Sequence, residues 1–117
     1  MENTYVIVLT TVGAAADARA LARTLVDERL AACVNILPGM VSHYWWDGKV
    51  ERGEEVVMFI KTRASFADRV RKAIKAGHPY TTPAIMVMPV ESVEDTYLRW
   101  IMTETDRAAM AGAGSAE

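Results

Sequence analysis

A hairpin centred on residues 47 and 48 decides the fold. The stretch reads Met40-Val41-Ser42-His43-Tyr44-Trp45-Trp46-Asp47-Gly48. An Asp-Gly pair after a strand-like run is a strong hairpin signal, because the tight turn needs two residues that tolerate positive φ. The chain returns through residues 49–60, which are polar near the turn and apolar from residue 56. The sequence therefore predicts two long antiparallel strands with a polar, aromatic tip and a core-like base.

Two glycines are expected to disturb these strands. Residues 32–37 form the first part of the outgoing strand, and Pro38-Gly39 separates them from residues 40–46. Proline cannot donate to a strand ladder and glycine accepts unusual backbone angles, so this pair predicts a bulge or a sharp bend. Gly53 predicts a second bulge on the returning strand. The acidic residues near the turn, Glu51, Glu54 and Glu55, are expected to form a solvated face.

The flanking segments complete an alternating pattern. A strand is expected at residues 5–11, a helix at 14–31, a helix introduced by the capping-box pattern of Ser65 and Asp68, a strand at 84–88 and a terminal helix from residue 92. The order β-α-β-β-α-β predicts an α+β, ferredoxin-like split βαβ domain, with two helices on one face of an antiparallel sheet. The other face needs further cover, for which the last helix is short.

Length and composition define the class of protein. The 117 residues fit a single domain, expected at residues 1–107, followed by a flexible Ala- and Gly-rich tail at 108–117. The net charge of −2 argues against a nucleic-acid binder. A single cysteine, Cys33, excludes an internal disulfide and a Cys-rich zinc module. With no targeting segment or membrane-spanning run expected, the sequence predicts a cytoplasmic protein without a membrane contact.

The aromatic run Tyr44-Trp45-Trp46 has three readings. Three large rings in a row must point to both faces of a strand, so ordinary packing covers only part of them. We favour a subunit interface, because a long hairpin exposes unpaired edges and Trp and Tyr are enriched at interfaces. A base-stacking platform is the third reading, and the net charge lowers it.

Few residues could carry chemistry. His78 lies in a loop fixed by prolines, where it is either a metal ligand or a solvent-exposed histidine. Lys61 ends a strand, where it could bind an anion or form a salt bridge. Cys33 is read as a small buried hydrophobe, since no base adjacent in sequence would activate it. No P-loop, HExxH or GxSxG motif is present in the sequence, so the residues do not suggest an enzyme.

Several motifs together resemble the CutA family of divalent-cation tolerance proteins. They are the run from Glu28 to Gly39, Tyr44-Trp45-Trp46, Lys61-Thr62, His78-Pro79-Tyr80 and Tyr97-Leu98-Arg99-Trp100, and the likeness covers about residues 5–105. The resemblance implies a homotrimer of the kind that PII signalling proteins form, a role in tolerance to divalent cations including copper, and no enzymatic reaction. The reachable His78-Pro79-Tyr80 loop and the strand-end Lys61 further suggest that clefts between the subunits of such a trimer bind a divalent cation or a small molecule. Lys61, His78 and Tyr80 are the candidate cleft residues, and His78 is the candidate metal ligand.

Four positions depart from metal-binding or acidic residues of some relatives: Thr10, Gly77, Thr81 and Ala84. The candidate ligand set is thereby reduced to His78. Two alternative functions stay open. The first is a very stable trimeric scaffold or signalling module for a partner protein, with metal binding incidental. The second is a small hydrolase on the same fold.

Overall fold

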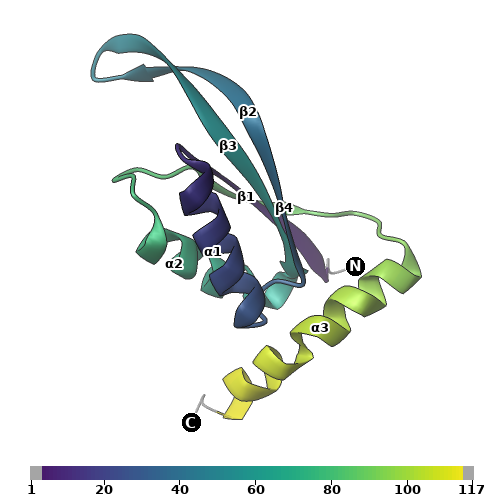
Figure 1. Cartoon of the computed structure of the whole chain (residues 1–117). Coiled ribbons are helices and arrows are strands. Elements are labelled where there is room, and N and C mark those ends of the chain that lie inside the picture. The colour runs from purple at the N-terminus through teal and green to yellow at the C-terminus, as the bar shows by residue number, and fades with distance from the viewer. Residues whose placement is uncertain (1–3, 115–117) are drawn as a thin grey trace.

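The computed structural model describes residues 4–114 and shows a four-stranded antiparallel sheet with three helices (Figure 1). The strand order is β2-β3-β1-β4. The elements are β1 Tyr5–Val12, α1 Ala15–Asp27, β2 Cys33–Trp46, β3 Lys49–Arg63, a 3-10 turn Ala64–Phe66, α2 Ala67–Gly77, β4 Ile85–Pro89 and α3 Asp95–Gly114. The mixed α+β class and the expected order of elements are confirmed. None of the described helices combines the length and hydropathy that crossing a bilayer requires.

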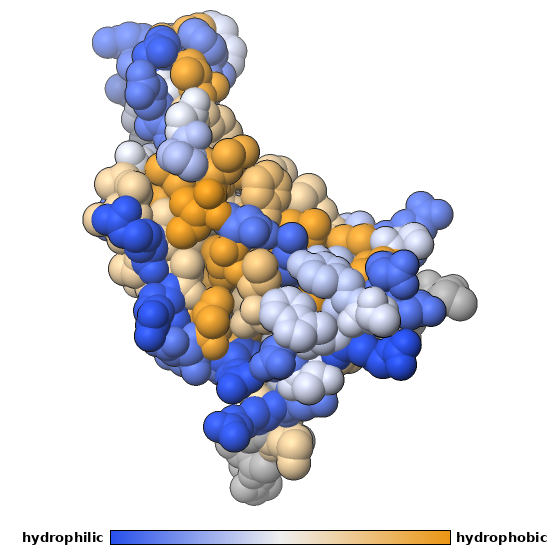
Figure 2. Space-filling view, turned by 45° about the vertical axis from the view of Figure 1, so that its right-hand side comes forward, coloured by the Kyte–Doolittle hydropathy of each residue, from blue (hydrophilic) through white to orange (hydrophobic). Residues whose placement is uncertain are grey.

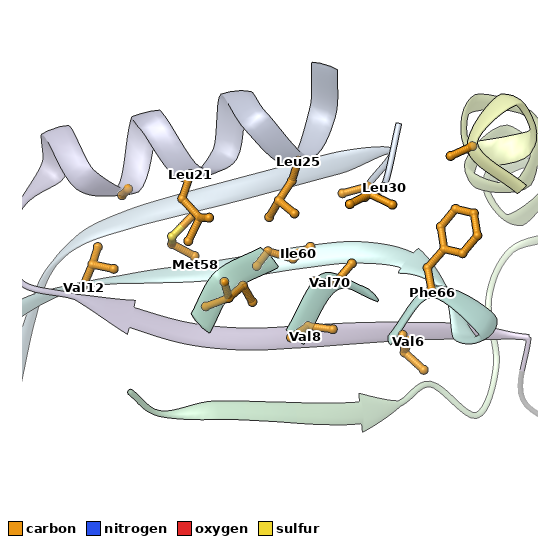
Figure 3. Packing of buried hydrophobic residues seen from close by; sticks show 14 of the residues in the cluster. Val6, Val8, Val12, Leu21, Leu25, Leu30, Met58, Ile60, Phe66 and Val70 are labelled. Atoms are coloured by element: carbon orange, nitrogen blue, oxygen red, sulfur yellow. The ribbon is translucent and has the colours of Figure 1, made fainter. Parts of the chain in front are cut away.

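Helices α1 and α2 cover one face of the sheet and enclose the core. In Figure 3, Leu21 and Leu25 point from α1 toward Met58 and Ile60 of β3. Alternate residues of β1 point the same way, as the two-residue period of a strand requires. Burying one such aliphatic side chain contributes about 1.5–3 kcal/mol. Apolar residues on one side of each element therefore hold this layer together.

The hairpin forms as predicted, with one exception. Asp47 and Gly48 have φ of 53° and 78°, which matches a tight two-residue turn. A register shift between Leu37 and Met40 confirms the bulge at Pro38-Gly39, where Gly39 has φ of 86°. The predicted bulge at Gly53 is wrong, because this glycine pairs in register with Ser42.

The third helix, α3, lies at the end of the sheet away from the hairpin tip (Figure 1). Arg63 anchors it from β3: its Nη2 donates to the carbonyl oxygen of Met102 at 2.6 Å, and its Nε donates to Thr105 Oγ1 at 2.9 Å. The Arg63 guanidinium also pairs with the Asp106 carboxylate at 2.5 Å. The far end of the sheet's second face is thus covered by α3.

Two predictions about the helices are wrong. The tail expected at residues 108–117 is helical to Gly114, and Ala108 is a buried member of the core cluster. Alanine is the strongest helix former, and the Ala-rich run continues α3 without a large anchoring side chain. Residues 115–117 lie outside the described part. The capping box at Ser65 does not form, since a 3-10 turn precedes α2 and no side chain caps it.

Candidate functional site

A cavity of about 730 Å³ lies between the bent hairpin and the loop that joins α2 to β4. In Figure 1 this loop leaves α2 and lies below the arch of β2 and β3. The hairpin contributes lining residues from Met40 onward, and the loop contributes residues 79–82 and Ala84. The bulge at Pro38-Gly39 shifts the pairing of β2 on β3 just before these residues.

Both ring nitrogens of His78 are engaged in hydrogen bonds. Its Nε2 lies 2.7 Å from the carbonyl oxygen of Thr11 and donates to it. Its Nδ1 accepts the backbone N–H of Tyr80 at 3.1 Å. These partners fix the neutral imidazole with its proton on Nε2. His78 therefore ties the loop to β1 and positions Tyr80.

Tyr80 connects the loop to the hairpin. Its hydroxyl donates to Glu55 Oε2 at 3.1 Å, and the hydroxyl of Ser42 donates to Glu55 Oε1 at 2.7 Å. Burial raises the pKa of the Tyr80 phenol, and the nearby Glu55 carboxylate raises it further. A Cβ atom at Gly13 would lie 2.9 Å from the Tyr80 hydroxyl, so a side chain at this position would displace that hydroxyl group.

The cavity lining is aromatic and acidic. The rings of Tyr44, Trp46 and Tyr80 line it, together with Glu54 and Glu55. None of its described lining residues is Lys or Arg. A site of this composition disfavours phosphates and other anions, and it can accept a cation.

Comparison with known proteins agrees with this structure. The family model "CutA1 divalent ion tolerance protein" matches residues 6–104. The chain belongs to the CutA family. A divalent-cation tolerance protein CutA of Thermus thermophilus is 41% identical over 99 residues, covering 85% of this chain and 96% of that protein. One from Escherichia coli O45:K1 is also 41% identical, covering 85% of this chain and 88% of its own length.

Solved CutA structures have the same fold. The structure of the Thermus thermophilus protein aligns with a TM-score of 0.83 at 40% identity, covering 86% of this chain and 98% of that one. CutA1 from Oryza sativa gives a TM-score of 0.85 at 38% identity, covering 88% and 94%. The chain spans only 56% of a chloroplastic rice CutA relative and 54% of a mouse one. The family model and the bacterial relatives are both described by tolerance to divalent cations.

Within one CutA chain, Lys61 lies apart from His78 and Tyr80. It pairs with Ile7 and Cys33 in the sheet, and its Nζ lies 5.6 Å from the centre of the Tyr97 ring. Lys61 therefore lies next to α3, at the opposite end of the sheet from the cavity. One subunit alone thus does not assemble the predicted three-residue cleft, and a cleft completed between subunits stays a prediction.

The aromatic run of the hairpin is exposed in the single chain. The exposed fractions of Tyr44, Trp45 and Trp46 are 44%, 75% and 54%. Trp45 pairs with Val50, which is 60% exposed, whereas Tyr44 and Trp46 line the cavity. Packing within the chain therefore does not account for these rings.

The four positions at which this chain lacks a metal-binding or acidic residue of some relatives fall in different environments. Thr81 and Ala84 line the cavity, whereas Thr10 is fully buried in the core and Gly77 ends α2. Cys33 begins β2 and is only partly buried, although a buried side chain was predicted. No group of three or more His, Cys, Asp or Glu side chains within the described residues is arranged to hold a metal ion.

Glu55 is a site residue that the sequence pattern does not reveal. Its place among the acidic residues of the hairpin predicts a solvated carboxylate, but the side chain is partly buried and accepts hydrogen bonds from Ser42 and Tyr80. Ser42 lies two residues along β2 from Tyr44, so both side chains point to the same face. The bulge at Pro38-Gly39 shifts the register of β2 on β3, so the sequence alone does not show that Ser42 lies close enough to bind Glu55.

Proposed function

We propose that this protein acts without catalysis in tolerance to divalent cations, as a cytoplasmic homotrimer of ferredoxin-like subunits arranged as in PII proteins. Its clefts would bind a divalent cation such as copper, or a small molecule. The observation that carries the proposal is the CutA family match over residues 6–104. The unpartnered surface of the hairpin supports the assembly.

That surface is extensive. Six large hydrophobic side chains of the hairpin are exposed: Leu37, Val41, Tyr44, Trp45, Trp46 and Val50. Figure 2 shows hydrophobic surface running from the hairpin down the side of the molecule toward α3. In the described part of the chain, β2 is an edge strand of 14 residues with no partner on its outer side. Long exposed edges of this kind invite pairing with another chain, and a second copy would satisfy their backbone groups.

Metal binding by His78 requires a rearrangement. A metal ligand needs a free nitrogen lone pair, and the one on Nδ1 accepts the Tyr80 N–H. The proton on Nε2 is donated to Thr11. Coordination must therefore break one of these two bonds, and the remaining donors must come from elsewhere in the assembly.

Calorimetric titration with Cu²⁺ and Zn²⁺ tests the metal hypothesis. The wild type should bind with a stoichiometry of one per subunit or one per cleft, and His78→Ala should lose this binding. His43→Ala is the matched control, since His43 also lines the cavity but belongs to the hairpin. Absence of binding to the wild type, or binding that His78→Ala leaves unchanged, would remove His78 as a ligand.

A scaffold for a partner protein is the second candidate, and the 75% exposure of Trp45 favours it. Exposed Trp side chains are frequent anchors of protein interfaces. A tagged protein should then recover one partner in stoichiometric amount from lysate, and Trp45→Ala should lose it. An empty pull-down with the wild type would contradict the scaffold hypothesis.

A further inference from the structure

We propose that the cavity under the hairpin binds a small organic ammonium ion, paired with the Glu55 carboxylate and faced by the rings of Tyr44, Trp46 and Tyr80. The inference rests on the proposed function, because it names the class of small molecule that the cleft takes. It depends on the charge, the aromatic lining and the size of the cavity.

The charge of the cavity selects a cation. Both hydrogen bonds to Glu55 come from neutral hydroxyl groups, those of Ser42 and Tyr80. Among the described residues, no Lys or Arg nitrogen lies within 4 Å of the Glu55 carboxylate, so its negative charge is not neutralised within the chain. Each of its oxygens keeps a further lone pair for a donor. The second acid, Glu54, has only a 3.7 Å contact with an exposed Arg52.

The aromatic lining favours an organic cation. Tyr44 and Trp46 are alternate residues of β2 and point to the same face, while Tyr80 comes from the loop opposite. Aromatic faces attract ammonium groups within about 6 Å of the ring centre, and several rings around one cation recognise alkylated ammonium ions. The raised pKa of the Tyr80 phenol, caused first by burial and then by Glu55, with a smaller effect from Tyr44, fits a site that disfavours added negative charge.

The donor set and the size argue for an organic ion over a bare metal ion. Transition metals in proteins take about four N, S or O ligands, and both nitrogens of His78 are already bonded. An alkylammonium ion needs one carboxylate and apolar or aromatic surface. The volume of about 730 Å³ lies within the range of small-molecule sites and far exceeds a single ion.

Calorimetric titration of the full-length protein with choline and with methylammonium tests this inference. The neutral isostere of choline, 3,3-dimethylbutan-1-ol, is the control for apolar binding at the same ionic strength. Choline should bind saturably and about ten-fold or more tightly than the isostere. Equal binding of the isostere, or no binding of either ammonium probe at 10 mM, roughly the weak limit for a specific site, would overturn the proposal.

Variants locate the binding. Glu55→Gln removes the charge and keeps the shape, and Trp46→Leu removes a ring, so each should weaken choline binding about ten-fold. Trp100→Leu is the matched control, because Trp100 is a partly exposed tryptophan that stacks on Tyr97 in α3 and does not line the cavity. It should bind choline as the wild type does, and unchanged binding by both Glu55→Gln and Trp46→Leu would place the ligand elsewhere.

Light scattering on the same samples separates this inference from the proposed function. A trimeric protein that fails to bind ammonium ions would overturn the inference alone. A monomeric protein that binds them would overturn the assembly and leave the cavity assignment intact. Binding only by a variant that has dissociated would show that a second copy fills the cavity, and this too would overturn the inference.

Discussion

Two buried threonines allow one substitution to be compared in opposite environments. Thr10 and Thr62 are both fully buried, on β1 and β3 respectively. The Thr62 hydroxyl donates to the carbonyl oxygen of Leu30 at 2.6 Å. The Thr10 hydroxyl has no hydrogen-bond partner among the described residues. Replacing either residue by valine keeps the shape and exchanges the hydroxyl for a methyl group.

The expected effects have opposite signs. A buried hydroxyl without a partner costs about 1–3 kcal/mol, so Thr10→Val should raise the free energy of unfolding by about 1 kcal/mol or more. Thr62→Val removes a made hydrogen bond and should lower the free energy of unfolding by about 1 kcal/mol. The two variants should therefore differ by about 2 kcal/mol or more.

Guanidinium unfolding followed by circular dichroism measures this difference. All three proteins are compared at one protein concentration, because an assembled protein's stability depends on concentration. Equal slopes of the transitions would show that only stability has changed. If Thr10→Val destabilises the protein as much as Thr62→Val does, the Thr10 hydroxyl has a partner in solution and the reasoning is refuted.

Three further perturbations address the interface, the pH response and α3. Trp45→Arg should leave the fold of one chain unchanged, since the side chain is 75% exposed. It should weaken assembly by several kcal/mol, which size-exclusion chromatography would show as later elution. Elution at the wild-type position would contradict an interface at Trp45. Burial, with smaller effects of Tyr97 and Cys33, raises the pKa of Tyr5 to about 12 from 10.0, so the phenol is held protonated in the folded state. The free energy of unfolding should fall between pH 10 and 12 by up to about 2.7 kcal/mol, and Tyr5→Phe should flatten this slope in denaturant titrations. Arg63→Met removes the hydrogen bonds of Arg63 to α3 and should lower the local stability of this helix by about 2 kcal/mol. Amide hydrogen exchange should then accelerate in α3 and stay unchanged in β1. Equal acceleration in both elements would show global destabilisation.

Local signals in the sequence predicted most of the fold. The Asp47-Gly48 turn and the Pro38-Gly39 bulge follow from backbone preferences that only a few residues satisfy. The order of helices and strands follows from the spacing of apolar residues. The helical residues 108–114 were missed because alanine has high helix propensity but offers no apolar periodicity to detect.

The site was less predictable, because it depends on contacts between distant segments. His78 and Tyr80 were recognised, but their partners Thr11 and Glu55 lie 67 and 25 residues away in the chain. Lys61 was grouped with them from its place at a strand end. Within one chain the register of β1 on β3 puts it beside Tyr97, and a cleft that joins it to His78 and Tyr80 between subunits stays a prediction. Pairing registers of this kind are set by the whole sheet and cannot be read from one segment.

The oligomeric state tests the central claim most directly. The exposed hairpin and the open edge of β2 favour pairing with further copies of the chain, and the proposed PII-like arrangement sets their number at three. Static light scattering at micromolar concentration should then give about 39 kDa, three times the 12.9 kDa of one chain. A well-folded particle near 12.9 kDa would contradict the account.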